Sequence, residues 1–293
     1  MTQPDIEVSE SRVAEVGGLS LRRSLPQRAR RTIGAWCFAD HYGPVAMTDE
    51  RSMSIGPHPH IGLHTVTWLF AGEMLHTDSL GSEQLIRPGQ LNLMTAGRGI
   101  AHAEETPTSH RDVTHGLQLW VAQPEATRHG EPAFEHHADL PELSIGAAVI
   151  RVLIGSLGEA RSPARADTPL VGLDVALGPG RSTIPLDGTH EHGVIVAGGE
   201  VRVDGRAVPT DSIAYLSPGR QNVTLEADAP ARLLLLGGEP LGEAVVMWWN
   251  FVARSHDEIV AAADEWNAAS SRFGQPVASH LARIPAPATP WSR

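Results

Sequence analysis

Short apolar runs interrupted by glycine or proline are the feature that most restricts how this chain can fold. The sequence holds 29 glycines and 22 prolines among 293 residues. Many short strands separated by such turn signals are typical of an all-β protein. The pattern predicts strands over residues 63–71, 73–79, 90–95 and 118–122, separated by turns at Ala71-Gly72, Leu80-Gly81 and Pro88-Gly89.

The length is sufficient for two domains, each with its own core. A loop-like stretch rich in proline, histidine and acidic residues, 123–141, predicts the junction between them. We therefore expect an N-terminal domain over residues 1–135 and a C-terminal domain over residues 136–293.

Two short clusters, His58-Pro59-His60 and His102-Ala103-Glu104, predict one metal site. Residues i and i+2 of a strand share a face, so His58 and His60 point the same way, as do His102 and Glu104. Two such strands side by side present three imidazoles and one carboxylate to a common point. This donor set suits Fe(II) or Mn(II), and four protein ligands leave two positions open on an octahedral ion. The alternative is that these histidines are ordinary packed side chains, since the chain holds 15 of them.

The even positions from Gly56 onward also carry ring-bearing or apolar groups as far as Phe70. If residues 56–72 were one extended run, His64 would share the face of His58 and His60. We expect that face to point into a barrel.

Charge and cysteine content exclude several classes of protein. The formal net charge is −11, and all 23 basic residues are arginine, so no lysine-rich tail or basic stripe is available for direct nucleic-acid binding. The single cysteine, Cys37, excludes an internal disulfide framework and a cysteine zinc site. The sequence shows no long apolar segment and no leader pattern, so we expect a cytoplasmic protein without membrane association.

The C-terminal half echoes the first in outline. The segment 189–199 parallels 58–72, but no histidine or glutamate follows Pro218-Gly219 where a counterpart of His102 and Glu104 would lie. His190 and His192 would therefore hold only half a coordination shell, and a loop or surface role is the favoured interpretation. Further on, Ser255 and Glu258 form a capping-box pattern that predicts an amphipathic helix ending near Phe273-Gly274.

Together the motifs resemble those of the pirin family. They are His58-Pro59-His60, Asp78-Ser79-Leu80-Gly81, the string Met94-Thr95-Ala96-Gly97-Arg98-Gly99-Ile100, His102-Ala103-Glu104 and Gly238-Glu239-Pro240-Leu241. The resemblance implies a bicupin: two antiparallel β-barrel (cupin, or jelly-roll) domains, with a metal in the first and a degenerate second domain that carries the short C-terminal helix. It also implies a monomer, and it carries the ligand roles onto His58, His60, His102 and Glu104.

One position departs from the family pattern, which usually has glutamate four residues after the second histidine. Here that position is His64. A neutral imidazole donates or accepts only through its tautomer. A hydrogen bond to a ligand, a fifth ligand position and ordinary packing all remain open for His64.

Similarity to quercetinase-like pirins implies a dioxygenase that opens flavonol-like, enolisable substrates with O2. In that mechanism Glu104 accepts the substrate hydroxyl proton, with His64 or His76 as relay. The cofactor would be one divalent metal ion, Fe(II) first, with Mn, Ni, Cu or Zn as alternatives. The competing expectation is a regulator whose metal state controls binding to a protein partner, and a third is a purely structural metal.

Overall fold

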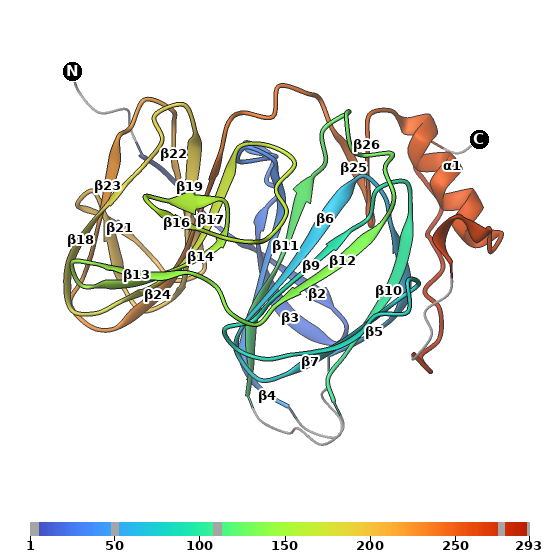
Figure 1. Ribbon diagram of the computed structural model, residues 1–293, viewed down its shortest axis with the longest axis horizontal. Coiled ribbons are helices and arrows are strands. Elements are labelled where there is room, and N and C mark those ends of the chain that lie inside the picture. Colours follow the sequence, from blue (N-terminus) through green and yellow to red (C-terminus); the bar gives the residue numbers. More distant parts are fainter. Residues whose placement is uncertain (1–5, 48–52, 108–112, 275–278, 292–293) are drawn as a thin grey trace. The chain divides into compact units, whose positions relative to one another are not determined.

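The computed structural model describes residues 6–47, 53–107, 113–274 and 279–291 of the chain (Figure 1). The predicted all-β class with one short C-terminal helix is confirmed. The predicted strand over 63–71 matches its observed bounds, and the strands expected over 73–79 and 90–95 are each slightly shorter. The strand predicted over 118–122 is the second half of a longer one, Val113–Ala122.

The described residues form two compact units. The N-terminal unit comprises Glu15–Leu21, Tyr42–His136 and Gly242–Arg293, and the C-terminal unit comprises Met1–Ala14, Arg22–His41 and His137–Leu241. Strands β2, β3, β4 and β12 contain residues of both units.

Strands of the N-terminal unit belong to a seven-stranded sheet, a four-stranded sheet and a hairpin. The seven-stranded sheet has the order β12 (Ala133–His137), β9 (Leu91–Thr95), β6 (Leu63–Ala71), β11 (Val113–Ala122), β4 (Trp36–Ala46), β3 (Leu19–Leu25) and β2 (Arg12–Val16). The four-stranded sheet has the order β5 (Ser54–His60), β10 (Ile100–Glu105), β7 (Met74–Asp78) and β8 (Glu83–Ile86). The hairpin consists of β25 (Val246–Trp248) and β26 (Phe251–Ala253).

The C-terminal unit repeats this division. Its seven-stranded sheet has the order β1 (Ile6–Glu10), β22 (Ser212–Leu216), β19 (Glu191–Gly198), β24 (Ala231–Gly238), β17 (Leu170–Leu177), β14 (Ala148–Ile154) and β13 (Glu142–Ile145). Its four-stranded sheet has the order β18 (Gly180–Pro185), β23 (Asn222–Ala227), β20 (Val201–Val203) and β21 (Arg206–Val208), and β15 (Ser156–Leu157) pairs with β16 (Ala160–Arg161). The core of this unit is almost entirely aliphatic, with leucine, valine and isoleucine from both sheets.

The helix α1 (His256–Asn267) begins where predicted, with Ser255 as N-cap accepting a hydrogen bond from the Glu258 N–H. It ends earlier than predicted because Ala269 adopts a left-handed φ of 55°, and a 3₁₀ turn, η1 (Ser271–Phe273), follows. Its apolar face packs on Ile61, Ala101 and Phe251 of the N-terminal unit, where Figure 1 shows it beside β10 and β26. The sequence-based division had assigned this helix to the C-terminal domain. It lies with residues 42–136 because its buried side chains find their apolar contacts there.

The predicted continuous face from residue 56 to residue 72 is wrong beyond His60. Strand β5 ends at His60 and β6 begins at Leu63, in a different sheet. Gly62 makes the bend with a φ of 67°, and a Cβ at this position would lie 2.2 Å from the Val252 carbonyl oxygen. Only glycine fits both the conformation and the space.

Candidate metal site

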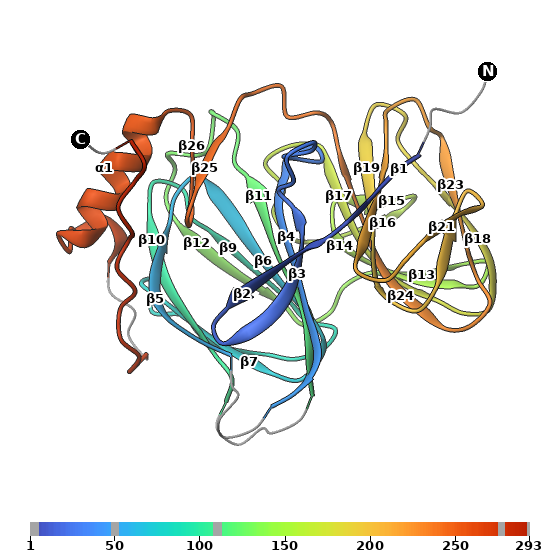
Figure 2. The same cartoon turned by 180° about the vertical axis from the view of Figure 1, so that it is seen from behind.

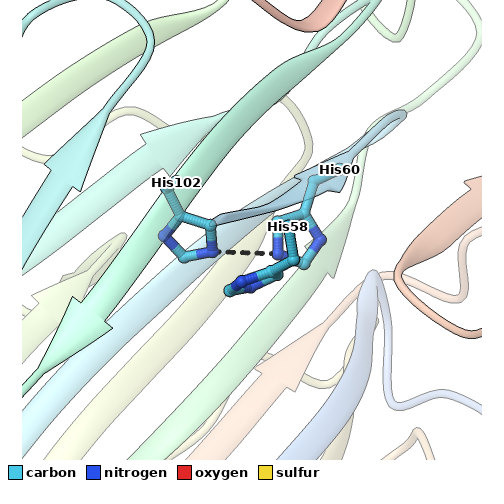
Figure 3. A group of neighbouring side chains, drawn as sticks. All are labelled: His58, His60 and His102. Atoms are coloured by element: carbon cyan, nitrogen blue, oxygen red, sulfur yellow. Dashed lines mark hydrogen bonds between the residues drawn. The ribbon is translucent and has the colours of Figure 1, made fainter. Parts of the chain in front are cut away.

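The two histidine clusters lie on neighbouring strands. In the antiparallel pair of β5 and β10, His102 lies opposite His58, and Ile100 lies opposite His60. A β-bulge between His102 and Glu104 shifts the register of the pair, so that Glu104 lies opposite Ile55. The predicted pairing of the two clusters is therefore what brings the three imidazoles together, as Figure 3 shows.

The three imidazoles converge closely enough to share one ion. His58, His60 and His102 each offer a ring nitrogen, and these three atoms lie within 4.8 Å of one another. His60 Nε2 and His102 Nε2 are 3.0 Å apart. All three residues are buried, with exposures of 5%, 1% and 1%.

Backbone carbonyls fix the tautomers of two of these rings. Nδ1 of His58 donates to the Gly56 carbonyl at 2.9 Å, and Nδ1 of His60 donates to the Asn250 carbonyl at 2.9 Å. A carbonyl only accepts, so the proton of each neutral ring sits on Nδ1 and Nε2 keeps its lone pair. This is the usual arrangement around a metal-binding histidine.

The third ring has a side-chain partner instead. Nδ1 of His102 lies 3.4 Å from Nδ1 of His76, and Nε2 of His76 lies 3.2 Å from a carboxylate oxygen of Asp78. If Asp78 accepts the proton on His76 Nε2, then His76 Nδ1 accepts from His102, and His102 Nε2 is left free like the other two. The ring of His76 stacks on Phe134 with centroids 4.5 Å apart, which holds its plane.

Asp78 is itself firmly held as a carboxylate. Its Oδ1 accepts hydrogen bonds from the backbone N–H groups of Leu80 at 2.8 Å and Ser82 at 3.1 Å. Burial alone would raise its pKa, but the hydrogen bond and electrostatic interaction with His76 and the hydrogen bonds from Ser82 outweigh burial and lower the pKa below its usual value.

Burial also keeps the three imidazoles neutral. It lowers the pKa of His58 to about 4 and the pKa values of His60 and His102 well below 6.5, and repulsion between neighbouring imidazoles adds to the effect. Neutral rings are the form that binds a metal.

Glu104 lies on the same strand as His102, two residues further on. It is 4% exposed, and burial raises its pKa to about 7, opposed by a contact with the Thr67 hydroxyl at 3.5 Å. Thr67 Oγ1 also lies 2.9 Å from Gln118 Oε1. Glu104 is not part of the group of three ligand atoms within 4.8 Å. Among the described residues it is nevertheless a buried carboxylate beside that group, on the strand that carries His102.

His64 lies on β6, and its Nδ1 is 2.9 Å from the Thr95 hydroxyl on β9. Thr65 and Thr67 occupy the opposite face of β6 from His64, because side chains alternate along a strand. Thr67 is the β6 residue that contacts Glu104, so the face bearing Thr67 is the one directed at Glu104. The structure thus brings His58, His60, His102 and Glu104 near one another and pairs His64 with Thr95.

These residues fit a divalent transition metal. Each of the three imidazoles offers a ring nitrogen to one point, and the approach of Nε2 of His60 to Nε2 of His102 at 3.0 Å is repulsive unless a proton or cation lies between them. A buried carboxylate next to this group adds a harder donor.

Sequence reasoning missed the partners that fix the rings. The carbonyl of Asn250 is distant in sequence, and no local signal marks it. Asp78 lay within a recognised motif without an assigned role. Its link to His102 depends on the pairing of β7 with β10, which sets His102 opposite Asp78 and Glu104 opposite His76.

The fold and the histidine cluster define a protein with two cupin domains, the first of which carries side chains suited to a metal ion. The family profile "Pirin" matches residues 18–121, and the profile "Pirin C-terminal cupin domain" matches residues 172–274. The chain therefore belongs to the pirin family, and the predicted bicupin fold is confirmed.

Individual relatives agree with this assignment. A Pseudomonas aeruginosa protein named "Putative quercetin 2,3-dioxygenase" is 44% identical over 96% of this chain and 90% of its own length. A "Pirin-like protein" of Caulobacter vibrioides is 37% identical over 96% of this chain and 98% of its own. A crystal structure described as quercetin 2,3-dioxygenase from Acinetobacter baumannii superposes with a TM-score of 0.94 at 42% identity, covering 98% of this chain and 97% of that one.

Proposed function

We propose that this protein is a mononuclear metal-dependent dioxygenase of the quercetinase type. In this proposal His58, His60, His102 and Glu104 hold one Fe(II) ion, and a flavonol-like substrate is opened with O2. The observation that carries the proposal is the convergence of three ring nitrogens within 4.8 Å beside a buried carboxylate. The names of the Pseudomonas and Acinetobacter relatives support the choice of substrate class.

A bound divalent ion would supply Lewis acidity and a site where an enolate and O2 meet. The chain's own contribution is to keep the ligand nitrogens unprotonated and correctly aimed. The Gly56 and Asn250 carbonyls do this for His58 and His60, and the His76–Asp78 pair does it for His102.

Glu104 is suited to take the proton of the substrate hydroxyl. In the metal-free protein burial raises the pKa of Glu104 to about 7, so burial favours uptake of a proton by this carboxylate, as a general base requires. The single proton of the Thr67 hydroxyl has a nearer acceptor in Gln118, at 2.9 Å against 3.5 Å for Glu104. Thr67 therefore donates mainly to Gln118, and its longer contact with Glu104 only partly opposes the effect of burial on the pKa of Glu104.

Two histidines were predicted as proton relays, and the geometry favours His76. It lies opposite Glu104 in the pairing of β7 and β10 and within 3.4 Å of His102. His64, on the opposite face of β6 from Thr67, is proposed here to support the sheet through Thr95.

The test is turnover by the purified full chain loaded in turn with Fe(II), Mn(II), Ni(II) and Cu(II). We expect flavonol loss by absorbance with uptake of one molecule of O2 for each molecule of flavonol. His102→Ala should abolish both signals. His129→Ala, which alters an exposed histidine of the same unit, is the matched control and should leave both unchanged. Full metal occupancy without O2 uptake would contradict the dioxygenase assignment.

A further inference from the structure

A cavity of about 670 Å³ lies within the C-terminal unit, separate from the metal site. Its walls come from β17, β19, β24 and the segment 155–169, which contains the β15–β16 hairpin; these strands can be followed in Figure 2. Small-molecule sites usually have volumes of about 300–1,000 Å³. This cavity therefore has the size of a ligand site.

Three residues that line the cavity carry buried polar atoms without a hydrogen-bond partner among the described residues. The atoms are Nδ1 of His190, Nδ1 of His192 and Oγ1 of Thr168. His190 and His192 are 9% and 1% exposed. Buried polar atoms in folded proteins are nearly always paired, so three unpaired ones around one cavity call for an explanation.

His190 lies just before the start of β19, and His192 lies within this strand. Glu191, between them, accepts hydrogen bonds from the Gly34 N–H at 2.6 Å and the Tyr215 hydroxyl at 2.9 Å. Glu191 therefore has a structural role, and its neighbours His190 and His192 are the residues of this segment that line the cavity. Their ring centroids are 5.9 Å apart.

Nδ1 of both rings is available to a hydrogen-bonding ligand. A carboxylate oxygen of Asp187 lies 3.9 Å from Nε2 of His190, which favours the proton on Nε2 and leaves Nδ1 with a lone pair. Burial, with repulsion from His190, lowers the pKa of His192 to about 4. A hydroxyl group, which can donate a hydrogen bond and need not carry charge, suits both atoms.

A metal ion does not fit this pair. Asp187, whose carboxylate lies 3.9 Å from His190, is exposed and already accepts hydrogen bonds from the Thr189 N–H and hydroxyl, at 2.9 Å and 2.7 Å. Among the described residues, the one group of three convergent ligand atoms is that of His58, His60 and His102.

The rest of the lining is mixed in polarity and has no uncompensated buried charge. Asp167 pairs with Arg165 at 2.7 Å, while Arg161 is exposed. The apolar surface comes from aliphatic side chains: Leu157, Leu170, Val171, Leu173 and Leu235. Such walls accommodate the flat face of a ring.

We propose that this cavity is a second ligand site, which binds an uncharged hydroxylated aromatic compound whose hydroxyl groups donate to His190 and His192. The site goes beyond the proposed dioxygenase activity, because none of its residues belongs to the metal site. Its occupancy does not require metal.

The probe is resorcinol, a benzene ring with two hydroxyl groups set apart from each other, added to the full chain labelled with ¹⁵N-histidine. We expect saturable shifts of the His190 and His192 ring signals, each assigned by its disappearance in the corresponding substitution. The same compound with both hydroxyls methylated should bind at least about tenfold more weakly, since it cannot donate a hydrogen bond.

Two variants localise the binding. His192→Phe keeps a ring of similar size but removes the acceptor, and it should weaken resorcinol binding at least about tenfold. His102→Ala, in the other unit, should leave resorcinol binding unchanged whether or not the protein retains metal or turns over flavonols. If His192→Phe fails to fold by circular dichroism, His190→Gln provides the same comparison.

Three results would overturn the proposal. The first is the absence of His190 and His192 shifts at saturating resorcinol, and the second is equal affinity for the methylated compound. The third is a second equivalent of bound zinc per chain that is lost in His192→Phe, which would identify a metal site instead.

Discussion

Glu104 differs from the three histidines in what burial does to its charge. Burial favours the neutral form of all four side chains, but the neutral carboxyl must lose a proton to become a ligand, whereas the neutral imidazoles are ready to bind. In the metal-free protein Glu104 has a pKa of about 7 and is mostly protonated at pH 6. His58, with a pKa lowered to about 4, carries no proton to release at that pH.

Metal binding at pH 6 should therefore release close to one proton per ion, because Glu104 must ionise. Isothermal titration in buffers of different ionisation enthalpy measures this number. In Glu104→Gln the release should fall to near zero. Release of two or more protons, or unchanged release in Glu104→Gln, would contradict the assignment of Glu104 as the protonated ligand.

Asp78 and His76 should act on metal affinity through His102. Asp78→Asn replaces the anchored carboxylate, and His76→Phe removes the acceptor of the His102 ring proton while keeping a ring to stack on Phe134. Loss of such a hydrogen-bond partner typically costs about 10–100-fold in metal affinity. We expect that loss in both variants, measured by competition with a chelator.

Thr77→Val is the matched control for these two changes. Thr77 lies between them on the same strand, and its buried hydroxyl has no hydrogen-bond partner among the described residues. The metal affinity of Thr77→Val should equal that of the wild type. If Asp78→Asn bound metal as tightly as Thr77→Val, the proposed role of Asp78 would be wrong.

At the scale of elements, the bend between β5 and β6 decides which residues can reach the metal site. Gly62 has a left-handed φ and would bring a Cβ to 2.2 Å from the Val252 carbonyl oxygen. Gly81 also has a positive φ, of 89°, but a Cβ there would meet no atom within 4 Å. Alanine at either position would be strained by the positive φ, but only at Gly62 would its Cβ also clash with a neighbouring atom.

Gly81→Ala should destabilise the protein by about 1–2 kcal/mol, the cost of a left-handed residue. Gly62→Ala should cost clearly more and should also weaken metal binding, because relieving the clash moves His60 at the end of β5. Urea unfolding and chelator competition measure the two effects. Equal stability of the two variants would show that the close approach at Gly62 does not matter.

The same bend explains which site residues could be predicted from the sequence and which could not. Alternation within a strand correctly placed His58 with His60, and the pairing with His102 followed from a second short strand. The extension to His64 failed because alternation holds only within one strand, and a positive-φ glycine changes both strand and sheet. His76 and Asp78 could not be linked to His102 without the register of β7 on β10.

The C-terminal helix shows the same contrast between local and distant information. Its start depends on Ser255 and Glu258, which are close in sequence, and was predicted. Its packing partners Ile61, Ala101 and Phe251 are distant in sequence, so its assignment to a domain could not be derived from periodicity. The cavity beside His190 and His192 was likewise invisible, because its walls come from separate strands.

At the scale of the whole molecule, the two units repeat one sheet plan with different chemistry. The C-terminal unit has an aliphatic core and two histidines whose Nδ1 atoms have no hydrogen-bond partner among the described residues, and the N-terminal unit carries the convergent histidine group. Within the described part of the chain, no helix has the length and apolar character needed to cross a membrane.

Whole-molecule stability should depend on pH through the metal site. When the metal-free protein is unfolded, His58, His60 and His102 take up protons near pH 6.5. In the folded protein the same residues stay neutral to lower pH. For His58 alone this contribution to stability is about 3 kcal/mol, and it is lost as pH falls from 6.5 toward 4. Glu104 acts in the opposite sense. Because burial raises its pKa to about 7, the protonated form of Glu104 stabilises the folded protein below pH 4.5, and this stabilisation is lost as the pH rises through 7.

As the pH falls, the stability lost through the three histidines exceeds the stability gained through Glu104. The metal-free protein should therefore be less stable at pH 5 than at pH 6.5. Urea unfolding at the two pH values measures the difference in free energy of unfolding. The drop should be smaller in His102→Ala, which removes one of the three histidines. An equal drop in wild type and variant would mean that these histidines do not control it.

Metal stoichiometry of the purified full chain, by elemental analysis, tests the central claim most directly. The account predicts close to one divalent transition-metal ion per chain after loading, and loss of that ion in His58→Ala, His60→Ala and His102→Ala but not in the control His129→Ala. Failure to retain metal under any loading condition, or full retention in the three site variants, would contradict it.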